Sequence, residues 1–198
     1  MRIECFFSIL SPFTYLAGDR LEQVAAARGV AIDYRPADLL KVFSEMGTPP
    51  VPKRHPARQA YRLQELRRLS RRAGLPLNIR PAHWPTDAAP GSAAIIAAQA
   101  AGADAGAVAR ALLRACWAED RDVAEPDVIA AALAEGGADP ALAAGTDAAR
   151  AAYARNTDEM IARGAFGAPF YFVGDEMFWG QDRIEHLAEH LDDIAAKG

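Results

Sequence analysis

The stretch CFFSILSPFTYLA, residues 5–17, passes from an apolar run into an amphipathic pattern at a Ser-Pro pair. Residues 2–10 predict a buried strand, and residues 12–28 place apolar side chains along one side of a helix. Ser11 suits the N-cap of that helix, and Pro12 suits its first position because the φ of proline is already helical. We therefore expect Ser11 where a strand gives way to a helix, with its hydroxyl exposed at the tip.

A second strand is expected at residues 30–36, VAIDYRP, where apolar and polar side chains alternate before a proline. The helix between the two strands is then a crossover, which joins parallel strands with a right-handed connection. Residues 37–55 are rich in proline and predict a loop. Residues 56–163 carry only helical patterns, which their abundant alanine favours. The expected helices are 57–73, 91–101, 104–118, 126–135 and 146–163.

Strand character returns in APFYFVGDEMFWG, residues 168–180, where two apolar runs flank Gly174 and Asp175. A two-residue turn with a glycine at positive φ predicts a hairpin. A final helix is expected from 181 to 195, with an apolar stripe along one side. This order of elements predicts an α/β, thioredoxin-like fold. A large all-helical insertion would separate the strand–helix–strand unit from the C-terminal hairpin and helix.

We place the thioredoxin-like domain at residues 1–38 plus 150–198 and the inserted helical domain at residues 39–149. A chain of 198 residues is long enough to bury such a core. Its net charge of −4 argues against a nucleic-acid partner. The N-terminal apolar run is interrupted by Glu4 and matches neither a secretory leader nor a membrane span. We therefore expect a cytoplasmic protein with no membrane partner.

The cysteines and histidines predict no metal site. Cys5 and Cys116 have no second ligand at metal spacing and are expected to be plain buried thiols. His186 and His190 are four residues apart but lack the glutamate of a metalloprotease motif, so a solvated helix face explains them better. No metal cofactor is expected.

Ser11 has a structural and a functional interpretation. As an N-cap, its hydroxyl accepts a hydrogen bond from the first turn of the helix. The same helix end stabilises anions, and a thiolate is one such anion. Thioredoxin-like redox proteins carry Cys-x-x-Cys at this position, where this chain has Ser11, Pro12, Phe13 and Thr14. Without either cysteine the site cannot run disulfide exchange, but it could host a sulfur that belongs to another molecule.

Four segments carry a resemblance that covers nearly the whole chain. They are SPFTYLA (11–17), PARQAYRLQELRRLSRRAGLPL (56–77), CWAEDRDVAEPDVI (116–129) and GAFGAPFYFVGDEMFWGQDRIEHL (164–187). In these segments the chain resembles the 2-hydroxychromene-2-carboxylate isomerases, which belong with the kappa-class glutathione transferases in the thioredoxin superfamily. The resemblance implies glutathione as the cofactor, a small aromatic carboxylate as the substrate and a homodimer as the assembly.

The resemblance also implies which residues bind glutathione: Ser11, Arg58, Ala168, Pro169, Trp179, Gly180, Gln181 and Asp182. A cis Ala168–Pro169 bond would aim the backbone of Ala168 at the cysteine of glutathione. Gln181 and Asp182, in the first turn of the last helix, would hold the γ-glutamyl end. From the residues alone, Pro169 suits an edge strand and Asp182 merely suits a helix N-terminus.

Arg58 stands where the family has a lysine, three residues before the tyrosine that matches Tyr61. Arginine keeps the charge but differs in reach and geometry, and a basic helix is usually a solvated face. The resemblance implies substrate contacts for Lys41, His83 and Trp84. A proline-flanked surface loop explains His83 and Trp84 equally well.

The resemblance therefore implies a glutathione-dependent isomerase of aromatic, naphthalene-type catabolism. It would convert 2-hydroxychromene-2-carboxylate to trans-o-hydroxybenzylidenepyruvate through reversible addition of the glutathione thiolate, with Ser11 as the activator of that thiolate. Two alternatives stay open at this point: a kappa-like glutathione transferase, and a non-catalytic thioredoxin-like binding module.

Overall fold

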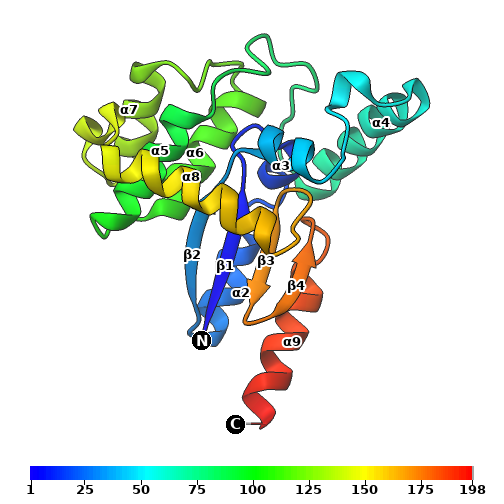
Figure 1. The fold of residues 1–198 in the computed structure, drawn as a ribbon, viewed down its shortest axis with the longest axis vertical. Helices are drawn as coiled ribbons and strands as arrows, with labels where there is room; N and C mark the ends of the chain where they lie inside the picture. The colour runs from blue at the N-terminus through cyan, green and yellow to red at the C-terminus, as the bar shows by residue number, and fades with distance from the viewer. Residues whose placement is uncertain (198) are drawn as a thin grey trace.

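The computed structural model describes residues 1–197 and contains one four-stranded sheet in the order β2-β1-β3-β4 (Figure 1). The strands are β1 (Arg2–Phe7), β2 (Ala31–Pro36), β3 (Phe170–Val173) and β4 (Glu176–Trp179). β1 pairs in parallel with β2 and antiparallel with β3, and β3 pairs antiparallel with β4. The parallel pair and the hairpin confirm the α/β, thioredoxin-like prediction. Gly174 supplies the positive φ of the hairpin turn, at 60°.

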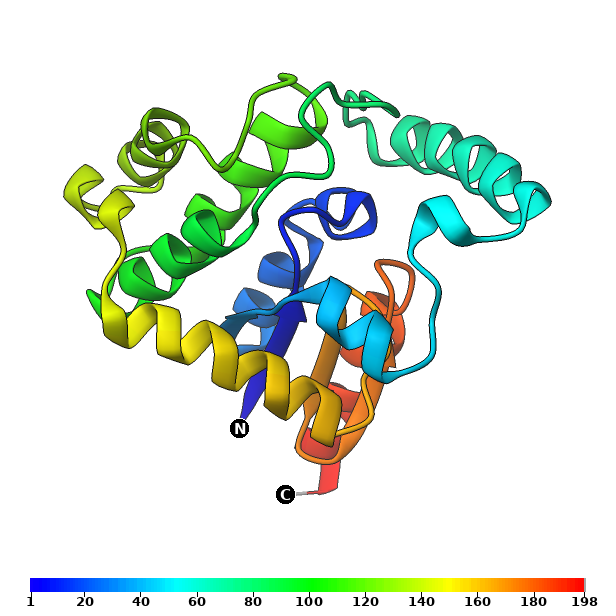
Figure 2. The ribbon, with the colours of Figure 1, turned by 45° about the horizontal axis from the view of Figure 1, so that its top comes forward.

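Helices cover both faces of this sheet. They are α1 (Pro12–Tyr15), α2 (Arg20–Arg28), α3 (Leu39–Glu45), α4 (Pro56–Ala73), α5 (Ala89–Ala100), α6 (Ala105–Trp117), α7 (Pro126–Glu135), α8 (Asp147–Ala162) and α9 (Ile184–Lys197), with short 3-10 turns at Val51–Lys53 and Pro140–Ala144. α8 crosses one face of the sheet, and α2 and α9 lie behind the other (Figures 1 and 2). The helices α3 to α8 lie between β2 and β3 in the chain, and among them α5, α6 and α7 pack together while α4 stands apart from them (Figure 2).

The alternation of side chains along β1 divides the core between these two faces. Cys5 and Phe7 belong to the larger apolar cluster, together with residues of α2, α6 and α9. Phe6 points the other way and packs edge-on against Phe172, with 5.6 Å between ring centroids, in a cluster that includes Met160 of α8. The successive apolar residues 5–7 of β1 are therefore explained by a strand that is covered on both faces.

The first predicted strand and helix are both too long. β1 ends at Phe7, and residues 8–11 form a turn in which the Ser11 N–H donates to the Ser8 carbonyl at 3.0 Å. The predicted helix 12–28 is divided into α1 and α2 at Gly18, whose φ of 61° and hydrogen bond to the Tyr15 carbonyl are typical of a helix C-terminus. The apolar period continues across this break, so periodicity does not reveal it.

Two further predictions need correction. The expected loop 37–55 contains helix α3, whose N-cap Asp38 accepts hydrogen bonds from the N–H groups of Leu40 and Lys41. The final helix begins at Ile184 rather than at 181 because Gly180, at a φ of 107°, starts a turn first. Gln181 and Asp182 therefore lie in the turn before α9 and not in its first helical turn.

Across residues 1–197, no helix combines the length and the hydropathy needed to cross a membrane. The same residues contain no group of three or more histidine, cysteine, aspartate or glutamate side chains placed to hold a metal ion.

Candidate active site

Ser11 lies in the turn between β1 and α1, at the position that the sequence predicts. Its Oγ accepts a hydrogen bond from the Thr14 N–H at 3.2 Å and donates one to the Ala168 carbonyl at 3.1 Å. The side chain is buried, with 3% of the residue exposed, so the prediction of an exposed tip is wrong. The segment before β3 contacts it through Ala168, and the Ala168–Pro169 bond is cis, as expected from the resemblance. The N-cap interpretation is confirmed.

A cleft with an empty volume of about 780 Å³ opens beside Ser11, and we call it the Ser11 cleft. The turn at 10–13, the start of α4, the loop at 166–168 and β4 supply its walls. Its lining residues are Leu10, Ser11, Pro12, Phe13, Leu39, Phe43, Thr48, Val51, Arg54, Arg58, Arg62, Trp84, Phe166, Gly167, Ala168 and Trp179. Five residues of the predicted site therefore share one cleft: Ser11, Arg58, Trp84, Ala168 and Trp179.

The Ser11 cleft is strongly cationic. Arg54, Arg58 and Arg62 line it at intervals of four residues, and the lining includes no aspartate or glutamate. None of the three forms an ion pair within residues 1–197. Burial and the neighbouring Arg54 lower the pKa of the Arg62 guanidinium to about 10, so it stays charged at neutral pH. Such a wall favours an anionic ligand.

A second cavity of about 860 Å³, which we call the Gln181 cavity, lies farther along the same helices. α1 contributes Phe13 to the first cleft, and Leu16, which directly follows α1, lines the second cavity. The Gln181 cavity holds charges of both signs. Gln181 is buried and its carbonyl accepts a hydrogen bond from Arg20 at 2.7 Å, while the Asp182 carboxylate pairs with Arg183 at 2.9 Å. The cavity lining is Leu16, Arg20, Leu69, Arg72, Ala73, Gln181, Asp182, Arg183 and Glu185.

An apolar chamber of about 1260 Å³ adjoins the Ser11 cleft on its other side. Trp84 and Phe43 line both spaces. Trp84 is fixed by two contacts: its Nε1–H donates to the Leu10 carbonyl at 3.0 Å, and its ring lies 5.8 Å from that of Trp117. The chamber is large enough for a bicyclic aromatic molecule.

Two of the three predicted substrate residues lie outside these spaces. The Lys41 ammonium pairs with Asp158 at 2.7 Å on an exposed face of α3 and lines none of the three cavities. His83 is half exposed, and its Nδ1 lies 3.8 Å from the Asp122 carboxylate. Neither residue lines the three cavities, whereas Trp84 stands in the wall of two of them.

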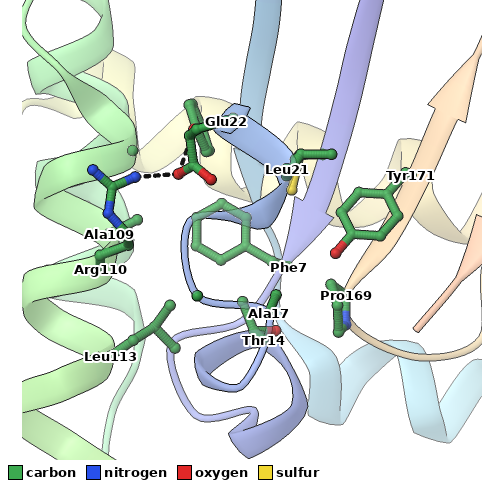
Figure 3. A pocket seen from close by; sticks show the side chains of 14 residues that line it. Phe7, Thr14, Ala17, Leu21, Glu22, Ala109, Arg110, Leu113, Pro169 and Tyr171 are labelled. Carbon is green, nitrogen blue, oxygen red and sulfur yellow. Dashed lines mark hydrogen bonds and ion pairs between the residues drawn. The ribbon is translucent and has the colours of Figure 1, made fainter. Parts of the chain in front are cut away.

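A smaller cavity, with an empty volume of about 370 Å³, lies beneath α1 (Figure 3). Thr14, Pro169 and Tyr171 line it, and Figure 3 shows the Tyr171 hydroxyl pointing toward Pro169. The buried Thr14 Oγ1 has no hydrogen-bond partner within residues 1–197. Thr14, which stands where a redox relative has its second cysteine, therefore makes no contact with the Ser11 hydroxyl other than through its backbone N–H.

The chain's own sulfur atoms are not available as nucleophiles. Cys5 and Cys116 are free and buried, as predicted. Burial raises the pKa of the Cys5 thiol well above its usual value, and burial followed by Asp122 and Asp120 raises that of Cys116 to about 12. Both thiols are therefore protonated at neutral pH.

We expect neither thiol of the native protein to react rapidly with Ellman's reagent at mildly alkaline pH, because burial blocks access as well as ionisation. In denaturant both thiols should react. Absorbance of the released thiophenolate measures the number of reactive thiols in the native and in the denatured protein. A rapidly reacting thiol in the native protein would show that the chain does bring accessible sulfur.

Comparison with known proteins identifies the family. A family model described as a DSBA-like thioredoxin domain matches residues 2–192. A 2-hydroxychromene-2-carboxylate isomerase of Pseudomonas putida is 30% identical over 190 residues, which cover 93% of this chain and 91% of that protein. The chain belongs to this isomerase family. The recognition made from four sequence segments is thereby confirmed.

Two further comparisons agree with this assignment. The 2-hydroxychromene-2-carboxylate isomerase of Pseudomonas sp. strain C18 is 31% identical over 189 residues, covering 92% of this chain and 86% of that protein. A solved structure of a 2-hydroxychromene-2-carboxylate isomerase superposes with a TM-score of 0.82 at 28% identity, covering 100% of this chain and 97% of the other. The thioredoxin-like fold of this isomerase family is therefore present over the full described length.

Sequence reasoning missed several cleft residues. The sequence predicts neither Arg54 nor Arg62 as a site residue, and Phe43 lies in a segment that it predicts as a loop. The spacing of Arg54, Arg58 and Arg62 by four residues was the available signal, since Arg58 and Arg62 share one face of α4.

Proposed function

We propose that the protein is a glutathione-dependent isomerase that converts 2-hydroxychromene-2-carboxylate to trans-o-hydroxybenzylidenepyruvate in aromatic catabolism. One observation carries the proposal. A buried serine hydroxyl lies at a cationic cleft, at the position where redox relatives have a cysteine, in a chain whose own thiols are buried elsewhere. Membership of the isomerase family supports the choice of reaction.

The residues present fit glutathione, a tripeptide with a thiol near its middle and carboxylates at both ends. The Ser11 cleft and the Gln181 cavity follow one another along α4, since Arg62 lines the first and Leu69 the second. The thiol would lie at Ser11. In the Gln181 cavity, Asp182 offers a carboxylate to the γ-glutamyl ammonium, and Arg72 offers a cation to its carboxylate.

Glutathione, when bound, supplies a thiolate that adds reversibly to the conjugated substrate. Ser11 stabilises that thiolate by turning its hydroxyl from the Ala168 carbonyl toward the sulfur, which lowers the pKa of the thiol. The Ala168 carbonyl is then free to accept a hydrogen bond from the bound tripeptide. Arg54 and Arg58 add positive charge to the same wall, and the apolar chamber holds the aromatic part away from water.

The short length of α1 changes which group stabilises the thiolate. The sequence predicts a helix over 12–28 with a full dipole, but α1 has 4 residues. A single turn aligns few peptide dipoles. We therefore assign the stabilisation to the Ser11 hydroxyl and the arginine wall rather than to a long helix.

Two measurements test the proposal against its alternatives. Calorimetric titration should show glutathione binding, and a chain that binds none at millimolar concentration would be a binding module instead. With the chromene as substrate, the rate should depend on added glutathione while the total free thiol stays constant during turnover. Steady loss of free thiol would identify a kappa-like transferase, because the conjugate would then be the product.

Gly180 is expected to be essential for the turn that presents Gln181 and Asp182. Its φ is 107°, and an added Cβ would lie 2.6 Å from the Asp182 Oδ1. Gly180→Ala should therefore lower the melting temperature and raise the KM for glutathione roughly 10-fold, the effect of about 1.4 kcal/mol of lost binding.

Gly102→Ala is the matched control, because Gly102 also has a positive φ, 77°, but has no atom within 4 Å of an added Cβ. Gly102→Ala should also lose stability, because alanine disfavours a positive φ, but it should leave the KM for glutathione unchanged. Equal KM values for the two variants would show that the turn at Gly180 does not contribute to glutathione binding.

A further inference from the structure

Arg62 is a cation without a partner. Its guanidinium carbon lies 6.0 Å from the centroid of the Phe13 ring and 5.7 Å from that of Trp84, within the Ser11 cleft. The residue is partly buried, yet within residues 1–197 it makes no side-chain hydrogen bond and no ion pair. A guanidinium has five N–H donors, and leaving them unused in a partly buried position costs free energy.

The two acidic side chains that line the adjoining chamber, Asp38 and Asp87, form no ion pair with Arg62 within residues 1–197. The Asp38 carboxylate accepts hydrogen bonds from Leu40 and Lys41 at the start of α3, and the Asp87 carboxylate accepts one from Ala89 at the start of α5. On α4 itself, Glu65 lies three residues from Arg62 but pairs with Arg68 instead, at 3.0 Å. The donors of Arg62 are therefore left for a ligand.

We propose that Arg62 binds the carboxylate of the aromatic substrate and thereby sets its orientation in the cleft. This inference rests on the proposed function and deepens it. The planar guanidinium fork binds a carboxylate through two parallel hydrogen bonds, and stacking on aromatic rings leaves its N–H edge open to do so. Trp84, which lies under Arg62, lines both the Ser11 cleft and the apolar chamber. A bicyclic carboxylate with its rings in the chamber would meet Arg62 at that shared wall.

Glutathione also has carboxylates, and one of them could bind Arg62 in place of the substrate carboxylate. Two features favour the aromatic ligand. The surroundings of Arg62 are two aromatic faces, Phe13 and Trp84, whereas charges of both signs gather in the Gln181 cavity. Arg54 and Arg58 also line the Ser11 cleft and can serve the tripeptide.

The test measures three ligands on four proteins. Coumarin-3-carboxylate, neutral coumarin and glutathione are titrated by calorimetry into the wild type and the variants Arg62→Gln, Arg62→Lys and Arg67→Gln. Arg67 is the matched control because it is an exposed arginine of the same helix that lines none of the cavities described. Melting temperatures establish that each variant is folded.

We expect Arg62→Gln to lower the affinity for coumarin-3-carboxylate roughly 10- to 100-fold, the range for loss of a hydrogen bond to a charged group. Arg62→Lys should recover part of that loss, while coumarin and glutathione should keep their affinities and Arg67→Gln should change nothing. In turnover, Arg62→Gln should raise the KM for the chromene without changing the KM for glutathione.

Four results would overturn the inference. If Arg62→Gln lost equal affinity for coumarin and for coumarin-3-carboxylate, Arg62 would have a packing role. If it lost affinity only for glutathione, Arg62 would bind the tripeptide. Unchanged affinity of Arg62→Gln for the carboxylate would refute the contact while the proposed function stands, provided that the wild type binds both ligands. A wild type that binds neither coumarin-3-carboxylate nor glutathione would refute both the Arg62 contact and the proposed function.

Discussion

Ser11→Ala should lower kcat roughly 10²-fold at saturating glutathione, the usual cost of removing one donor from a developing or stabilised anion. The Ser11 hydroxyl donates to the Ala168 carbonyl, and both residues line the cleft. Without it the bound thiol should ionise at a higher pH, because the hydrogen bond favoured the thiolate. Ultraviolet absorbance of the bound thiolate against pH measures that shift directly.

The same substitution removes an N-cap and should lower the free energy of unfolding by about 1 kcal/mol. Thr146→Ala is the matched control, since Thr146 caps α8 by accepting from the Ala149 N–H at 3.0 Å and lines none of the cavities described. It should lose similar stability and keep full activity. If both variants lost activity equally, loss of the cap rather than of the donor would be the cause.

Trp84→Ala should raise the KM for the aromatic substrate roughly 10²-fold, from about 2–3 kcal/mol of lost ring contact. Trp84 forms the wall shared by the Ser11 cleft and the chamber, so its removal merges them. The KM for glutathione should change much less. Loss of the contact with Trp117 should also cost about 3 kcal/mol of stability, the lower end for a large aromatic, because Trp84 is only partly buried.

Trp84→Phe separates these effects. It keeps an aromatic wall but loses the hydrogen bond from Nε1 to the Leu10 carbonyl. We expect stability to fall by about 1 kcal/mol, the net value of one hydrogen bond, with a KM for the substrate within a few-fold of wild type. Steady-state kinetics and thermal melting are the measurements. A KM for the aromatic that Trp84→Ala leaves unchanged would place the substrate elsewhere.

Much of the fold could be predicted because its signals are local. The alternation at 30–36, the Gly174-Asp175 turn and the apolar faces of the long helices all follow from side-chain periodicity and turn chemistry. The break at Gly18 and the short helix α3 could not be found in the same way. The apolar pattern continues through the break at Gly18, and prolines lie on both sides of α3.

The site was predictable only in part, for a physical reason. The position of Ser11 follows from a cap signal that lies within a few residues of it. The aromatic rings beside Arg62, by contrast, come from α1 and from the loop at Trp84, which only the folded chain brings together. The pairing of Lys41 with Asp158 of α8 is likewise invisible in the sequence, because only the folded chain brings the two residues together.

In the proposed reaction, the sulfur at Ser11 belongs to glutathione and not to the chain. The most direct measurement is the initial rate of chromene isomerisation with no thiol, with glutathione and with S-methylglutathione, which offers the same tripeptide without an ionisable thiol. We predict turnover with glutathione alone, and competitive inhibition of glutathione by the methylated form. Equal rates in all three conditions would rule out the glutathione thiolate as the nucleophile, because the catalytic nucleophile would then have to come from the chain itself.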